Sequence, residues 1–207
     1  MLFKLTYFCI AVQMIFIDFK RELTVNNVIV NEIKQRFFAY RNGVVASALR
    51  KGGAPHKTIM GCQIADVTAI ANEFDKNAEV ARALWDNLDY RECQLAAIML
   101  YRPEEFDYDT AKTWCVEVKS LEVADVLAHR LLKHCGFATE LVNELLASTD
   151  ATQRYLAFRL MLNLLISNRV EDYVEWKGVV NAEHDVAVAN GDGVMAELTA
   201  SILEELL

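Results

Sequence analysis

The residues best suited to carry chemistry lie on one short stretch, residues 121–134. Glu122, Asp125, His129 and Lys133 recur there at intervals of three or four positions, so a helix would place them on one face. Two carboxylates that share a face can oppose a positive charge that develops beside them. The opposite face of the same helix would be apolar: Ala124, Leu127, Ala128 and Leu131. Ordinary solvation of a helix predicts the same polar stripe, so both interpretations stay open at this point.

The composition favours helices as the elements that position this stripe. The chain has 207 residues, of which 54% are apolar and 24% are charged, so it can build a core and is unlike a disordered chain. Two prolines and eight glycines argue against collagen-like and turn-rich all-β structures. We therefore expect one all-α domain over residues 26–207, preceded by an apolar segment in residues 1–25.

Apolar residues recur with a period close to 3.6 from residue 26 onward, which predicts a succession of helices. No stretch bounded by turn dipeptides shows sustained alternation of apolar and polar residues, so no sheet is expected. The predicted helices span about residues 26–42, 44–51, 64–74, 77–88, 90–101, 109–119, 121–134, 138–147, 151–166, 169–181 and 193–206.

These helices repeat in pairs. Asp89, Ser120 and Asp150 begin equivalent units, because the residues that follow them match at spacings of 31 and 30 positions. A helix-pair period of roughly 30–45 residues is typical of a HEAT-like or armadillo-like solenoid, that is, an α-α superhelix. An ordinary α-bundle with accidental self-similarity is the alternative.

In such a solenoid the second helix of each pair lines the concave side. The polar faces of these helices then form a groove around Asp125. The candidates for this groove are Glu122, His129, Arg91, Gln94, Thr152 and Tyr155, with Arg154 close by.

The charge distribution is uneven along the chain. The net charge is −8, yet the first 60 residues hold nine Lys and Arg against three acidic residues. Such asymmetry permits one basic surface for a polyanion, whereas a solvated surface without a partner is the alternative. We expect phosphate contacts from Lys34, Arg36, Arg41, Arg50, Lys51 and Lys57.

Cysteine and histidine patterns argue against metal and disulfide chemistry. The five cysteines are well separated without a CxxC pair, and the four histidines form no HExxH motif. We therefore expect no metal, no cofactor and a reducing, cytoplasmic location. Residues 5–17 are apolar but too short to span a bilayer, which takes about 20 residues. They are either a core element or a segment upstream of a true start at Met14; both interpretations keep the protein in the cytoplasm.

Several segments together resemble the AlkD-like DNA alkylation repair family. Leu84-Trp85-Asp86, followed by Arg91–Ala97, is similar to the family segment LWD…RExQxxA. His56–Gly61 is similar to its glycine-centred turn, and Ser120–Asp125 falls where the family has W-[DE]-x-x-D. Gln153-Arg154 resembles a Gln-Arg pair on the next concave helix. The resemblance covers about residues 28–166.

The resemblance implies a HEAT-like superhelix that cradles duplex DNA. Active members are DNA glycosylases that hydrolyse the N-glycosidic bond of cationic N3- or N7-alkylated purines, without a cofactor. By this resemblance Asp125 matches the catalytic carboxylate, and Arg154 matches a DNA-backbone arginine, with Arg159 as the rival position. Leu121 stands where the family has a catalytic tryptophan. Trp85 and Trp114 are expected in the core.

Three functions follow as candidates. The first is a repair glycosylase, acting as a monomer on duplex DNA that carries alkylated bases. The second is a non-catalytic relative that binds damaged or branched DNA in the same groove, and the departure at Leu121 favours it. The third is a protein-interaction solenoid, which is a common use of helical repeats.

Overall fold

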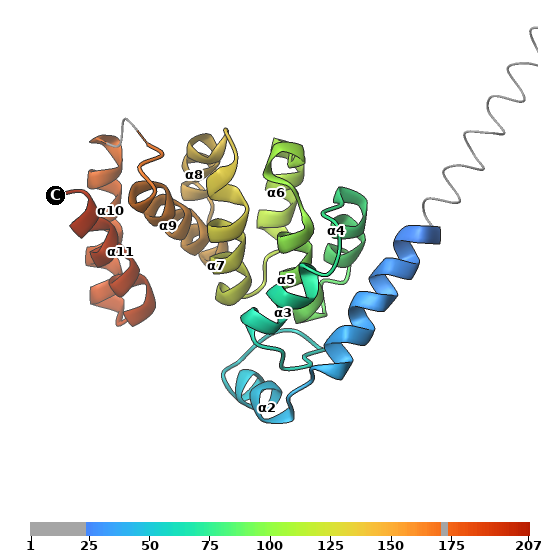
Figure 1. The fold of residues 1–207 in the computed structure, drawn as a ribbon. Helices are drawn as coiled ribbons and strands as arrows, with labels where there is room; N and C mark the ends of the chain where they lie inside the picture. The colour runs from blue at the N-terminus through green and yellow to red at the C-terminus, as the bar shows by residue number, and fades with distance from the viewer. Residues whose placement is uncertain (1–23, 171–173) are drawn as a thin grey trace, which may run out of the picture.

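Helix pairs stack side by side in a curved row (Figure 1). The computed structural model describes residues 24–170 and 174–207, so most of the apolar segment over residues 1–25 lies outside the described residues. Within the described ranges the only β feature is an isolated bridge between Thr58 and Tyr90. The structure confirms the predicted all-α solenoid.

The N-terminal part begins with a helix over residues 24–39 and continues into α2 (Gly43–Lys51) and α3 (Ile64–Ala71). Asn42 starts α2, because its side chain accepts hydrogen bonds from the backbone N–H groups of Val44 and Val45. The helix over residues 24–39 buries Ile33 and Phe37 against the core.

The remaining helices form four successive pairs. Their bounds are α4 (Ala78–Trp85) with α5 (Arg91–Leu100), α6 (Tyr108–Glu117) with α7 (Leu121–Arg130), α8 (Ala138–Leu146) with α9 (Ala151–Ile166), and α10 (Val174–Asn190) with α11 (Gly193–Glu205). The second helices touch in sequence, α5 on α7, α7 on α9 and α9 on α11, and so build an inner layer. This is the predicted order of inner helices.

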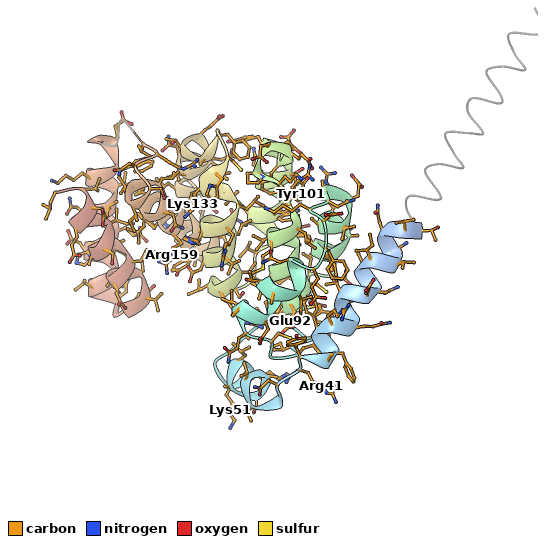
Figure 2. All side chains as sticks on the ribbon, viewed as in Figure 1. Arg41, Lys51, Glu92, Tyr101, Lys133 and Arg159 are labelled. Atoms are coloured by element: carbon orange, nitrogen blue, oxygen red, sulfur yellow. The ribbon has the colours of Figure 1, made fainter. Side chains whose placement is uncertain are left out.

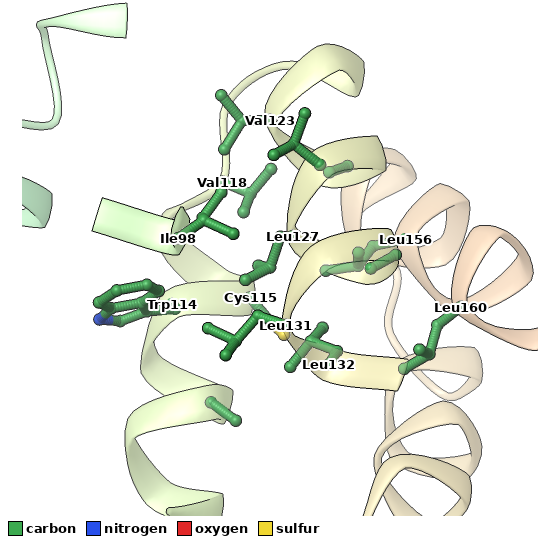
Figure 3. Packing of buried hydrophobic residues seen from close by; sticks show 14 of the residues in the cluster. Ile98, Trp114, Cys115, Val118, Val123, Leu127, Leu131, Leu132, Leu156 and Leu160 are labelled. Atoms are coloured by element: carbon green, nitrogen blue, oxygen red, sulfur yellow. The ribbon is translucent and has the colours of Figure 1, made fainter. Parts of the chain in front are cut away.

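One continuous core runs through the row. Leu127 of α7 and Leu131, directly after that helix, are fully buried. They lie against Cys115 of α6 and against Val118, the residue that follows α6 (Figure 3). The rings of Trp85 and Trp114 stack with centroids 4.0 Å apart. Both tryptophans are buried, as predicted.

Two predicted helices differ most from the structure, while the bounds of most others agree within about three residues. The helix expected over residues 169–181 is wrong: α10 continues to Asn190 and ends where Gly191 adopts a φ of 71°, a conformation that glycine accepts readily. The helix expected over residues 121–134 ends at Arg130, because Leu131 leaves helical backbone angles before a short 3-10 turn over Leu132–His134. None of the described helices is both long and apolar enough to cross a lipid bilayer.

Candidate functional site

The helices α7 and α9 present matched rows of polar side chains. Asp125 of α7 contacts Tyr155 and Arg159 of α9, and Nδ1 of His129 lies 3.5 Å from Oδ1 of Asn163. Because these contacts join residues 30 to 34 positions apart in the same order along both helices, α7 and α9 run parallel. We call these two rows the α7–α9 floor.

Asp125 lies at the centre of this floor and is held by two donors. The Tyr155 hydroxyl donates to Oδ1 at 2.8 Å, and Nε of Arg159 donates to the same oxygen at 2.6 Å. The side chains of Asp125 and Arg159 remain 38% and 31% exposed. Among the described residues no donor reaches Oδ2 of Asp125. The carboxylate is therefore held through Oδ1, is partly exposed, and keeps Oδ2 without a donor from the described residues.

The donors of Asp125 stay protonated. Burial lowers the pKa of Arg159, but the hydrogen bond and the charge of Asp125 outweigh it, so the pKa lies above its ordinary value. Burial, followed by the hydrogen bond to Asp125, raises the pKa of Tyr155. Both groups therefore donate to the carboxylate at neutral pH.

Glu122, one turn before Asp125, has a different environment. Arg91 of α5 grips it with two hydrogen bonds, from Nε at 2.6 Å and from Nη2 at 2.5 Å. The Arg91 side chain is only 2% exposed and also donates to Oε1 of Glu92, which is completely buried, at 2.8 Å. Paired charges of this kind are stable in a core only while each partner is present.

The same network holds the turn before α3. Glu92 accepts the backbone N–H groups of Met60 at 3.1 Å and Gly61 at 2.9 Å. Gly61 has a φ of 81°, and a Cβ atom there would lie 2.1 Å from the carbonyl oxygen of Asn42. Only glycine permits this close approach. Arg91 and Glu92 therefore tie the turn beneath α2 to the start of α7.

Two pockets form a groove at the N-terminal end of this floor, and Asp125 lines neither of them. One of about 700 Å³ lies between the apolar side chains of α2 and the start of α7, and we call it the α2 pocket. The other, of about 340 Å³, lies between α9 and the start of α11, and we call it the α11 pocket. Leu121 and Thr152 line both, so the two pockets meet at the N-terminal ends of α7 and α9. The groove is thus mainly apolar on the α2 side.

A buried polar pair, His56 and Gln94, lies next to the α2 pocket. Nε2 of His56 and Oε1 of Gln94 are 2.8 Å apart. The other nitrogens, Nδ1 of His56 and Nε2 of Gln94, lack a hydrogen-bond partner in the described part of the chain. His56 is the member of the pair that lines the pocket.

The structure places the predicted groove residues unequally. Leu121 is 40% exposed at the junction of the two pockets, and His129 is exposed further along α7. The expectation that Arg91 and Gln94 face the groove is wrong, since α5 is covered on both flanks and buries both side chains.

The two candidate arginines of α9 have different partners. Arg154 lines the α11 pocket and forms an ion pair with Glu183 of α10. Arg159 contacts Asp125. The geometry therefore brings Arg159 to the candidate carboxylate and directs Arg154 to α10.

The predicted phosphate contacts of the N-terminal part are mostly engaged within the protein. Lys57 pairs with Asp89 at 2.5 Å, and Arg36 lies within 3.6 Å of Glu32 and 3.5 Å of Glu73. The others are Lys34, which donates to Asn87, Arg41, which donates to the Phe38 carbonyl, and Arg50, which donates to the Ile59 carbonyl. Lys51 is exposed at the end of α2, away from Arg159 (Figure 2).

Asn163, which faces His129, was absent from the predicted site. Tyr155, which was expected on the groove face of its helix, supplies a donor to Asp125. The spacing of Asn163 from Arg159, four residues along the same helix, is the signal that could have identified it. A cation at the end of the same stripe, Lys133, also belongs to this floor (Figure 2).

No group of three His, Cys, Asp or Glu in the described ranges is arranged to hold a metal ion. The four described cysteines are buried free thiols. Burial raises the pKa of Cys62 to about 12 and that of Cys135 to about 11, so neither is a thiolate at neutral pH.

Comparison with known proteins identifies the family. The sequence profile of the DNA alkylation repair enzyme family matches residues 33–186, which include α7, α9 and the contacts of Asp125. No curated protein and no solved structure matches the chain. The matched range exceeds half of the chain, so this protein belongs to the DNA alkylation repair enzyme family.

Proposed function

We propose that the protein is a DNA glycosylase that hydrolyses the N-glycosidic bond of cationic alkylated purines in duplex DNA. One observation carries the proposal: Asp125 lies open at the centre of the α7–α9 floor, held through a single oxygen by Tyr155 and Arg159. One copy of the chain is sufficient for this arrangement, because every contact of Asp125 comes from its own α9.

The chemistry explains why a carboxylate is needed. When a cationic purine leaves C1′ of the deoxyribose, positive charge develops on the sugar. A carboxylate already fixed beside C1′ stabilises that charge without reorganising during the reaction. In Asp125 the anchored oxygen Oδ1 sets the orientation, and Oδ2 faces the sugar and the attacking water.

Arg159 takes the role of positioning residue. It donates to Asp125 and to the Tyr155 hydroxyl, the latter at 3.2 Å, so it holds both partners in place. Its side chain is partly exposed and has further N–H groups that can reach a phosphate oxygen. Arg154 is directed to Glu183 instead, and we assign the family's backbone arginine to Arg159.

The test is release of the free base. A duplex that carries N7-methylguanine or N3-methyladenine is incubated with excess protein, and the released purine and the remaining abasic site are quantified. We expect both products in equal amounts, up to the amount of alkylated duplex, and faster than base release without protein. The absence of release from every alkylated duplex would remove the glycosylase assignment.

A second candidate is a non-catalytic protein that binds damaged or branched DNA. Leu121 favours it, because an aliphatic side chain stands at the junction of the two pockets where the family has an aromatic ring. This candidate predicts tight binding of alkylated or branched duplexes without release of a base. No contact in the groove specifically favours the third candidate, a protein-interaction solenoid.

A further inference from the structure

A second group of cations gathers at the far end of the α7–α9 floor, away from α2. We call it the C-terminal cationic cluster and define it as Lys76, Arg130, Lys133, His134 and Arg169. Three members come from the end of α7 and the 3-10 turn after it, Arg169 follows α9, and Lys76 precedes α4. The cluster thus draws on three separate connections at one edge of the row.

The members lie close enough to repel one another. Burial first, and then Arg169 and Arg130, lower the pKa of Lys133. Burial, and then Arg169, Lys133, His129 and Lys76, lower the pKa of His134. The fold therefore keeps these positive groups close together although they repel one another.

Among the described residues the cluster has no acidic partners. Lys34, Arg41 and Arg50 of the N-terminal part also lack them, but these three donate hydrogen bonds to neutral acceptors within the protein. Many of the remaining cations are neutralised. Lys57, Lys112 and Arg36, for example, each form an ion pair with a carboxylate. Within the described ranges Lys76, Arg130, Lys133 and Arg169 form none. Glu171 and Asp172, which follow Arg169 in sequence, lie outside the described residues.

The cluster continues the row that holds Asp125. Nζ of Lys133 lies 3.2 Å from Nδ1 of His129, which in turn faces Asn163. Lys133 lies in the 3-10 turn directly after α7, the helix that carries Asp125, so a short duplex can reach both. Cations at the ends of helices also complement the helix dipole, but that role does not explain Lys76, which lies before α4.

We propose that the C-terminal cationic cluster binds the phosphodiester backbone of duplex DNA next to the base that is acted on at Asp125. The inference rests on the proposed function for the identity of the polyanion. The location of the phosphate contacts is a separate claim. We place them at the ends of α7 and α9, because the N-terminal cations are largely engaged within the protein.

The experiment measures affinity for an undamaged duplex as salt rises from about 50 to 200 mM. The variant R130A/R169A removes two exposed arginines of the cluster. The matched control K112A/K177A removes two positive charges elsewhere, from α6 and α10. Because each phosphate contact contributes about 0.9 to the slope of log K against log salt, we expect R130A/R169A to flatten the slope by about 1.8. The control should keep the wild-type slope.

Four results overturn the proposal: a wild-type slope for R130A/R169A, equal flattening in the control, no binding of duplex by the wild-type protein, or tighter binding of an acidic peptide than of duplex. Saturation of the wild-type protein by inorganic phosphate, with duplex bound no more tightly, would also overturn it in favour of a small-anion site. Excision by the wild-type protein is measured separately at saturating protein, so that DNA binding and base release are assessed independently. Binding with the expected slopes but no release of base would leave the cluster intact and remove only the glycosylase.

Discussion

Two arginine–carboxylate pairs lie one helical turn apart on α7, and they differ in almost every physical respect. Glu122 pairs with Arg91, which is 2% exposed and also contacts the fully buried Glu92. Asp125 pairs with Arg159, and both side chains of that pair are about one-third exposed. The first pair ties α7 to α5 and to the turn before α3, although Glu122 is itself 29% exposed and lines the α2 pocket. The second pair joins α7 to α9 alone, and both of its members are partly exposed.

The comparison indicates that the pair with the buried arginine has a structural role and that the more exposed pair is available for chemistry. Charges removed from water must keep their partners, so the Arg91 network can only hold α2, α5 and α7 together. An exposed pair can exchange its partner for a substrate at little cost in stability. Two carboxylates one helical turn apart thus serve different purposes. Variants of the first pair should mainly lower stability, and variants of the second should mainly lower activity.

The largest expected effect on stability comes from Arg91→Ala. The substitution leaves Glu92 charged and buried without a cation, which typically costs about 3–5 kcal/mol. Chemical denaturation should report this loss in the free energy of unfolding. The matched variant Arg159→Ala should cost less than about 1 kcal/mol, because its pair is partly exposed. Similar losses from both variants would break the comparison.

The next effect concerns Leu121, which lines both pockets at their junction. Leu121→Trp places an aromatic face in open space beside the expected cationic purine. A cation–π contact of about 0.5–2 kcal/mol corresponds to a roughly 2–30-fold faster excision. Single-turnover rates of the two proteins measure it. An unchanged or slower rate would mean that the base does not approach residue 121.

The smallest effect is the coupling between Asp125 and Arg159. A double-mutant cycle with D125N and R159A should give a coupling energy of about 0.2–1 kcal/mol in unfolding experiments. Because the pair is exposed, added salt should reduce that coupling. A coupling of several kcal/mol that resists salt would place Asp125 with the structural pair and weaken its catalytic role.

Much of the fold could be predicted from the sequence, because helical periodicity and capping residues act locally. The bounds of α9 were predicted to the residue, with Asp150 as the N-cap. The end of α10 was not, since the sequence places no proline or positive-φ glycine between the expected end and Gly191. The end of α7 was also missed. Leu131 fits the apolar stripe of the helix, so the stripe does not indicate that its backbone leaves the helical conformation.

The site was less predictable, because partners come from other elements. The stripe of α7 correctly grouped Glu122, Asp125 and His129, but it could not distinguish the buried pair from the open one. Arg91 and Gln94 share the helical register of a groove face, yet α5 has neighbours on both flanks and encloses them. Likewise, the positive charge of the first 60 residues gave no hint that Lys57 meets Asp89.

The most direct test of the account compares D125N with E122Q on the same alkylated duplex. Both variants remove one negative charge from α7 and keep the size of the side chain. With protein in excess and the duplex saturated, D125N should slow base release about 10²–10³-fold, and E122Q should slow it less than about tenfold. Equal rates for D125N and the wild-type protein, or equal losses in the two variants, would contradict the claim that Asp125 is the group that acts on the sugar.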